Sequence, residues 1–169
     1  MSQQPHSFQN KWLAGNALLD QVERWRSEKQ RVVFTNGVFD LLHPGHVAYL
    51  EAARANGDVL IVGLNSDESA QRLAKGPARP INSLSARAMV LAGLQCVDAV
   101  TSFEEDTPSA LIELVRPDVL CKGGDYREDE VAGGEFVKAE GGRVVIIPFL
   151  EGFSTTAIER KILSANRKT

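Results

Sequence analysis

The sequence predicts an α/β fold with a doubly wound, five-stranded parallel sheet covered by helices on both faces. Five short apolar runs alternate along the chain with segments of helical periodicity, which is typical of parallel strands joined by helical crossovers. Polar or glycine-rich segments follow four of these runs directly. Because parallel strands end at one edge of a sheet and ligands bind there, these segments predict a single site. The expected strand order is 3-2-1-4-5.

The first half of the chain is expected to hold two helices and two strands. An apolar stripe predicts a helix over residues 11–29, and the β-branched run 31–35 predicts the first strand. Pro44 suits the first position of the next helix, because the amide hydrogen that it lacks would have no helical partner there. Asn56–Gly57 is a typical helix stop. The second strand, 58–64, is almost wholly apolar, as expected for a strand buried on both faces.

The second half continues the alternation. Glycines and prolines predict a loop over 73–82, and a serine-capped helix over 83–94 is expected to turn Met89, Val90 and Leu94 inward. The remaining strands are expected at 97–101, 117–121 and 143–148, and the remaining helices at 108–115, at 128–140 and from the hydroxyl-rich turn at 154–156 to about residue 166.

Length and composition indicate one globular domain, residues 31–169, preceded by a tail and helix, residues 1–30. A chain of 169 residues that is 43% hydrophobic can build a sizeable core. The net charge of −3 gives no reason to expect attraction to nucleic acid or to a membrane, and no stretch is long and apolar enough to cross one. The N-terminus lacks a signal-peptide pattern, and Cys96 and Cys121 are expected to be buried free thiols, so a cytoplasmic protein is expected.

The stretch 36–46 carries the first functional motif. It lies between a strand and a helix, and its two histidines, His43 and His46, are three residues apart, so both rings can lie on one side of the helix start. Free amide groups and the positive end of the helix dipole point in the same direction. This arrangement suits a polyphosphate, and the alternative is that both histidines are ordinary turn and capping residues.

Further candidates follow other strands. Asp67 follows the second strand, where helix capping by Ser66 or Asp67 is the alternative to ligand binding. Arg87 either binds phosphate or fixes the neighbouring loop by an ion pair. Lys122 opens a glycine-rich turn after the fourth strand. Three hydroxyls at 154–156 open the last helix, where one can cap it and three can hold phosphate together with free amides.

Together these motifs resemble the nucleotidyltransferase superfamily of cytidylyltransferases and small adenylyltransferases, which have a Rossmann-like fold. H-x-G-H follows Gly37-Val38-Phe39-Asp40, and the last turn is similar to the second signature of this superfamily, with Phe153 in place of isoleucine. Within it the chain most resembles the D-glycero-β-D-manno-heptose 1-phosphate adenylyltransferase domain of the ADP-heptose pathway. This resemblance implies transfer of AMP from ATP to the sugar 1-phosphate, with release of pyrophosphate, for lipopolysaccharide core synthesis. Because about thirty residues precede the first strand, the sugar kinase is expected to be a separate protein.

The resemblance also assigns roles to residues. It implies three catalytic residues, His43, His46 and the loop lysine Lys75, which would close over the triphosphate. The implied nucleotide-binding residues are Val38, Phe39, His43, His46, Lys75, Gly152, Phe153, Ser154, Thr155 and Thr156. The implied substrate-binding residues are Asp40, Asp67, Arg87 and Lys122, with the lysine near the acceptor phosphate. Magnesium is expected to bind mainly through the nucleotide phosphates, and no metal site made of protein side chains alone is expected. Arg79 and Arg160 are less certain matches.

Two alternative functions remain at this point. A glycerol-3-phosphate-type cytidylyltransferase would use CTP, but those enzymes usually carry an arginine that is absent from Phe149-Leu150-Glu151-Gly152. A non-catalytic nucleotide-binding module is the other, and the presence of both histidines argues against it. The apolar residues Pro148–Leu150 favour ATP over CTP. ATP and a sugar phosphate are the expected small-molecule partners. A homodimer is expected through Trp12, Leu13 and Trp25, with packing inside the chain as the alternative.

Overall fold

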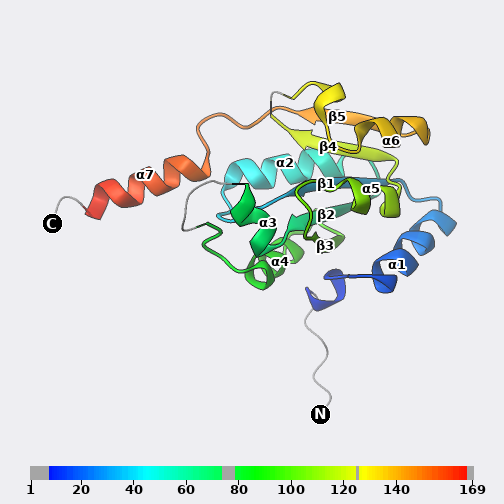
Figure 1. The fold of residues 1–169 in the computed structure, drawn as a ribbon, viewed down its shortest axis with the longest axis horizontal. Helices are drawn as coiled ribbons and strands as arrows, with labels where there is room; N and C mark the ends of the chain where they lie inside the picture. Colours follow the sequence, from blue (N-terminus) through cyan, green and yellow to red (C-terminus); the bar gives the residue numbers. More distant parts are fainter. Residues whose placement is uncertain (1–7, 74–78, 125, 167–169) are drawn as a thin grey trace, which may run out of the picture.

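The computed structural model describes residues 8–73, 79–124 and 126–166. Its sheet has five parallel strands in the order β3-β2-β1-β4-β5 (Figure 1), so the predicted fold class and strand order are confirmed. The strands are β1 (Val32–Gly37), β2 (Val59–Asn65), β3 (Ala99–Phe103), β4 (Val119–Gly123) and β5 (Arg143–Ile147). The first four begin and end one or two residues later than expected, which brings Lys122 into the end of β4.

Helices cover both faces of the sheet. They are α1 (Asn16–Ser27), α2 (Pro44–Arg54), α3 (Asp67–Arg72), α4 (Leu84–Ala92), α5 (Ser109–Val115), α6 (Gly134–Ala139) and α7 (Thr155–Asn166), with short 3-10 helices η1 (Gln9–Lys11) and η2 (Glu128–Glu130). Apolar residues of α2 and α4 pack on one face, and those of α1, α5 and α6 pack on the other. Helix α7 projects away from the sheet (Figure 1). Within the described residues, no helix is long and apolar enough to cross a membrane.

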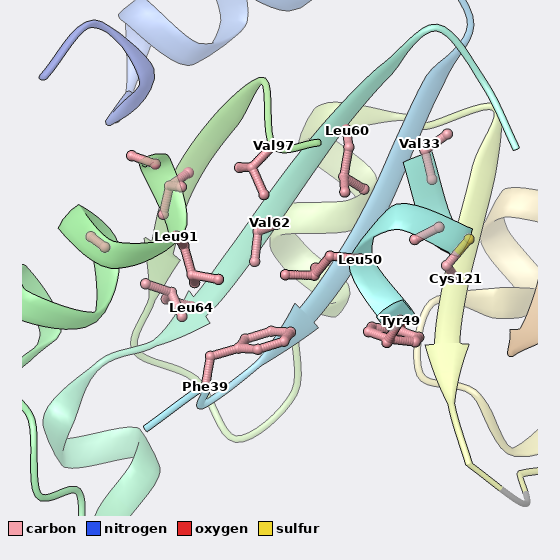
Figure 2. Close-up of a cluster of buried hydrophobic side chains, with 14 of the residues drawn as sticks. Val33, Phe39, Tyr49, Leu50, Leu60, Val62, Leu64, Leu91, Val97 and Cys121 are labelled. Carbon is pink, nitrogen blue, oxygen red and sulfur yellow. The ribbon is translucent and has the colours of Figure 1, made fainter. Parts of the chain in front are cut away.

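Side-chain alternation explains why the strands are apolar throughout. Val33 and Leu60 belong to the core on the α2 and α4 side, whereas their neighbours Phe34 and Ile61 belong to the core on the opposite side. Figure 2 shows the first of these cores, in which Leu50 of α2 lies over the centre of the sheet. All five of these side chains are buried, and each contributes about 1.5–3 kcal/mol of hydrophobic stabilisation.

The N-terminal helix is shorter than predicted. Helix α1 begins at Asn16, because the preceding residues pair with the sheet instead: the Leu13 amide donates to the Val100 carbonyl at 2.9 Å, and Trp12 forms a parallel bridge with Val100. Trp25 of α1 is buried in the core beside α5, so this side chain packs inside the chain, which was the alternative to a dimer contact. Trp12 stays partly exposed, and the homodimer itself stays a prediction.

Two other helix predictions were wrong in detail. Met89 and Val90 are 49% and 53% exposed, because the inward face of α4 is formed by Arg87, Ala88 and Leu91, which recur at helical spacing. The single helix expected over 128–140 is divided into η2 and α6. The division falls at Gly133, whose φ of +81° lies in the left-handed region that interrupts a helix.

Candidate active site

A cavity of about 840 Å³ opens at the carboxyl edge of the sheet. It lies between the loop after β1, the start of α2, the end of β4 and the start of α7. Ten of the residues singled out from the sequence line it, namely Val38, Phe39, Asp40, His43, His46, Lys122, Phe153, Ser154, Thr155 and Thr156. These segments are far apart in the chain, and strand order 3-2-1-4-5 brings them together where the direction of winding reverses.

The two histidines lie at the start of α2 as predicted. His43 is the residue before the helix, Pro44 occupies its first turn, and the His46 amide donates to the His43 carbonyl at 2.9 Å. The two rings stack with centroids 3.9 Å apart, and Phe39 packs on His46 at 5.4 Å. A Cβ at position 45 would lie 3.0 Å from His43 Nδ1, so a larger residue there would push the His43 ring aside by a few tenths of an ångström.

The protonation state of His43 follows from its position. Burial removes water from the ring and lowers its pKa below the ordinary value of 6.5, against a smaller opposing effect of the backbone of His43 itself. Its Nδ1 is buried and has no hydrogen-bond partner in the part of the chain that the structure describes. The neutral form is therefore favoured near pH 7, and an anionic ligand beside the ring would raise its pKa again.

Asp40 lines the cavity, and its carboxylate holds residues 79–82, the loop before α4. Its Oδ2 accepts from Arg79 Nη1 at 2.7 Å and from the Ile81 amide at 2.8 Å, and its Oδ1 accepts from the Asn82 amide at 2.8 Å. Burial raises the pKa of this carboxyl, but the two amides and the guanidinium outweigh that effect and lower the pKa below its ordinary value. Asp40 therefore stays charged and anchors residues 79–82 at the pocket.

Arg87 and Asp67 do not line the cavity. The buried Arg87 guanidinium donates to the carbonyls of Val38, Asn65 and Asn82 at 2.8, 2.9 and 3.1 Å, and it pairs with Asp67 at 2.7 Å. Arg87 thus forms an ion pair at the start of α3 and holds the loop through the Asn82 carbonyl. Arg87 is buried, Asp67 is 36% exposed and neither is among the residues that line the cavity, so binding of substrate by either residue stays a prediction. Ser66 caps α3 by accepting from the Ser69 amide.

Lys122 projects from the end of β4 into the cavity. Its Nζ lies 3.3 Å from Asn36 Oδ1 and 5.6 Å from the centroid of the Tyr126 ring. Asn36 and Tyr126 also line the cavity, as does Tyr49, which shares a 2.6 Å hydrogen bond with Thr35. Asn36, the penultimate residue of β1, was not assigned a role from the sequence. Tyr49 was also missed, although it lies three positions after His46 on the same helix face.

The start of α7 forms the opposite wall of the cavity. Ser154 caps the helix, since its Oγ accepts from the Ala157 amide at 3.1 Å, while Thr155 and Thr156 occupy the first turn. Glu159, on the next turn, was not predicted and also lines the cavity. Gly152 precedes this wall and is not among the lining residues. The loop lysine Lys75 lies outside the described residues.

The described part of the cavity wall offers hydrogen-bond donors and positive charge. Across residues 8–73, 79–124 and 126–166, no group of three histidine, cysteine, aspartate or glutamate side chains is placed to hold a metal ion. Among the described residues, the two carboxylates in the cavity wall, Asp40 and Glu159, both contact Arg79. Imidazoles, ammonium, guanidinium and a helix start suit phosphoryl groups.

Comparison with known proteins agrees with this geometry. Residues 34–161 match the family described as Cytidylyltransferase-like. Two curated relatives, both named Bifunctional protein HldE, come from Methylobacillus flagellatus and Pseudomonas aeruginosa. They are 53% and 58% identical over 96% and 86% of this chain, which spans 33% and 30% of their length. A lipopolysaccharide core biosynthesis protein from Thermoplasma volcanium matches with a TM-score of 0.60 and 28% identity, over 72% of this chain and 97% of its own.

Replacing Arg87 should destabilise the protein strongly. Arg87→Ala would remove the guanidinium that donates to three carbonyls and to the Asp67 carboxylate, and we expect the free energy of unfolding to fall by about 3–5 kcal/mol. The control is Arg127→Ala, which removes an ion pair between two exposed side chains and should cost less than about 1 kcal/mol. Urea denaturation followed by circular dichroism measures both, and equal losses would contradict the anchoring role.

The lowered pKa of His43 should make stability depend on pH. As pH falls below the ordinary value of 6.5, the unfolded chain binds a proton at His43 before the folded chain does. The stabilisation is therefore complete above this pH and is lost as pH falls towards the folded pKa. Urea denaturation of the wild type and of His43→Gln, between about pH 7.5 and 5.5, should show the steeper loss in the wild type. A His43 titration midpoint above 6.5 by NMR would contradict this.

Proposed function

This chain belongs to the cytidylyltransferase-like family, and we propose that it is an adenylyltransferase that joins AMP from ATP to D-glycero-β-D-manno-heptose 1-phosphate, giving ADP-heptose and pyrophosphate. The stacked His43–His46 pair carries this proposal, because it opens α2 in the same cavity as Lys122 and the first turn of α7. The similarity to the HldE proteins and to a lipopolysaccharide core biosynthesis protein supports the heptose pathway. We assign the reaction to residues 31–169.

The reaction needs no nucleophile from the protein. An oxygen of the acceptor phosphate attacks the α-phosphorus of ATP, and the bond from this phosphorus to the oxygen of the leaving pyrophosphate breaks. Negative charge grows on the α-phosphoryl oxygens and on the leaving group, so catalysis consists mainly of positioning and charge stabilisation. In our proposal His46 donates a hydrogen bond to the α-phosphoryl oxygens and His43 donates to the pyrophosphate side.

Other residues would hold the two substrates. Thr155, Thr156 and the free amides of the first turn of α7 would bind the leaving group, and Lys75 would close over it. Lys122, held by Asn36, would bind the acceptor phosphate from the β4 side. The remaining nucleotide contacts in this proposal are Val38, Phe39, Phe153, Gly152 and Ser154, and the remaining substrate contact is Asp40, through the loop that it anchors.

Three further expectations belong to this proposal. Magnesium would bind through the triphosphate oxygens and water and would neutralise part of their charge. The protein would act in the cytoplasm, where ATP and the sugar phosphate are found. A homodimer would form through the N-terminal segment, where Trp12 is partly exposed although Trp25 is buried inside the chain. Sedimentation that shows only monomer at micromolar concentration would contradict the dimer.

ATP should be preferred over CTP. Phe149 and Leu150 form an apolar part of the cavity wall, which suits the larger face of adenine, while backbone groups can read its amino edge. We expect kcat/KM to be at least about tenfold higher for ATP, which corresponds to about 1.4 kcal/mol. Pyrophosphate release with ATP, CTP and GTP against several sugar and alditol phosphates tests both substrates. A preference for CTP with glycerol 3-phosphate would favour a cytidylyltransferase, and absence of turnover would favour a binding module.

His46→Ala should lower kcat by about 10²–10³-fold, the usual cost of removing one donor to developing charge. The fold should survive, since His46 lies in the first turn of α2 rather than in the core beneath it. Pyrophosphate release under saturating substrates measures the loss, and thermal denaturation controls for folding. Turnover close to that of the wild type would exclude this role for His46.

A further inference from the structure

Arg79 lies in the cavity wall between two carboxylates. Its Nη1 donates to Asp40 Oδ2 at 2.7 Å, and its Nη2 contacts Glu159 Oε1 at 2.6 Å. The side chain is only 12% exposed, and all three residues line the same cavity as His43. Arg79 thus connects Asp40, in the first motif, to Glu159 on α7 at the place proposed for the triphosphate.

The two carboxylates differ in how firmly they hold Arg79. The Asp40 side chain is 5% exposed and also accepts two backbone amides, so it is fixed. The Glu159 side chain is 36% exposed, and in the described residues Arg79 is the one cation within ion-pair distance of it. Water can solvate the Glu159 carboxylate when it leaves Arg79, so separating this pair costs less than separating Arg79 from the buried Asp40. Glu159 can therefore leave Arg79 at low cost, while Asp40 keeps the guanidinium in place.

One hydrogen-bond donor of Arg79 is not used by either carboxylate. Its Nε is buried and, in the part of the chain that the structure describes, has no hydrogen-bond partner. A buried donor without an acceptor is unfavourable, so a ligand that supplies an acceptor there is favoured. The planar guanidinium matches phosphate oxygens in a two-point contact, which a carboxylate on a neighbouring helix turn provides only in part.

The position of Glu159 indicates which part of the ligand it would exclude. Glu159 lies three and four residues after Thr156 and Thr155, so the three side chains share one face at the start of α7. These hydroxyls face the leaving pyrophosphate in the proposed reaction. A carboxylate on that face repels a polyphosphate as long as it stays in the wall.

We propose that Arg79 binds the terminal phosphates of the nucleotide, and that Glu159 occupies this cation in the free protein and is displaced when the triphosphate binds. The inference rests on the proposed function in taking a nucleoside triphosphate as the ligand. It assigns Arg79 a binding role and makes Glu159 an internal competitor. If the Arg79–Glu159 contact served instead to position α7 for binding, removal of Glu159 would weaken nucleotide binding, so the two roles predict opposite signs.

Glu159→Gln tests the inference directly. Calorimetry should show Kd for ATP and for pyrophosphate falling about two- to fivefold, the range that loss of a partly exposed ion pair allows. The matched control is Glu151→Gln, which removes the same charge from an exposed residue before α7 that does not line the cavity, and which should leave both Kd values unchanged. Unchanged or weaker binding by Glu159→Gln would overturn the inference.

Arg79→Lys completes the test. It keeps a cation beside Asp40 but loses the two-point phosphate contact, so Kd for ATP should rise at least about tenfold. Adding Glu159→Gln to this variant should tighten binding less than it does in the wild type, because relief of charge repulsion remains while the competition for the guanidinium is gone. Thermal denaturation checks that each variant is folded. An Arg79→Lys protein that binds ATP and pyrophosphate as the wild type does would overturn the proposal.

Turnover by the wild type separates this inference from the proposed function. If Glu159→Gln binds ATP and pyrophosphate more tightly but no sugar phosphate is converted, the competition stands and the adenylyltransferase assignment fails. If heptose 1-phosphate is converted but Glu159→Gln binds more weakly, the assignment stands and the competition fails. A wild-type protein that binds neither ATP nor pyrophosphate would overturn the inference.

Discussion

The guanidinium of Arg87 is buried beneath the pocket, where it donates to carbonyls at the turn after β1, at the end of β2 and just before α4. Asn65 is the last residue of β2, whereas Val38 and Asn82 lie in segments between the regular elements. One rigid, permanently charged side chain therefore fixes three chain segments at once. The turn that precedes His43 starts from this anchor, so the geometry of the imidazole pair depends on a residue that does not line the cavity.

Two arginines thus serve one loop in different ways. The guanidinium of Arg87 is buried and donates to three carbonyls and one carboxylate, and Arg87 does not line the cavity. Arg79 holds the same loop through Asp40 but faces the cavity and shares its outer side with Glu159 on α7. The contrast shows that burial determines whether an arginine stabilises the fold or can bind a ligand. The buried guanidinium is part of the fold, and the one at the wall retains donors for an anionic ligand.

Much of this arrangement could be predicted from the sequence, because the strands are apolar on both faces and the motifs follow them directly. The paired histidines and the Lys122 turn were found in this way. The role of Arg87 could not be decided, since its partners are backbone carbonyls from three distant segments that no local pattern reveals. The inward face of α4 was misassigned for a related reason: a charged residue occupies a core position, so Met89 and Val90 appeared to complete the apolar stripe. Glu159 was missed because only the fold brings it to Arg79.

The pairing of Trp12 and Leu13 with Val100 has a consequence for how the protein behaves outside its native state. Strand β3 ends the sheet on that side, and an uncovered lateral strand offers free amide and carbonyl groups to any other extended chain. The N-terminal residues Trp12 and Leu13 pair with some of these groups, and α1 covers the adjacent apolar face of the sheet. A shortened protein that starts at residue 31 would uncover both surfaces. It would then tend to self-associate by strand addition and precipitate, even though every residue of the cavity were still present.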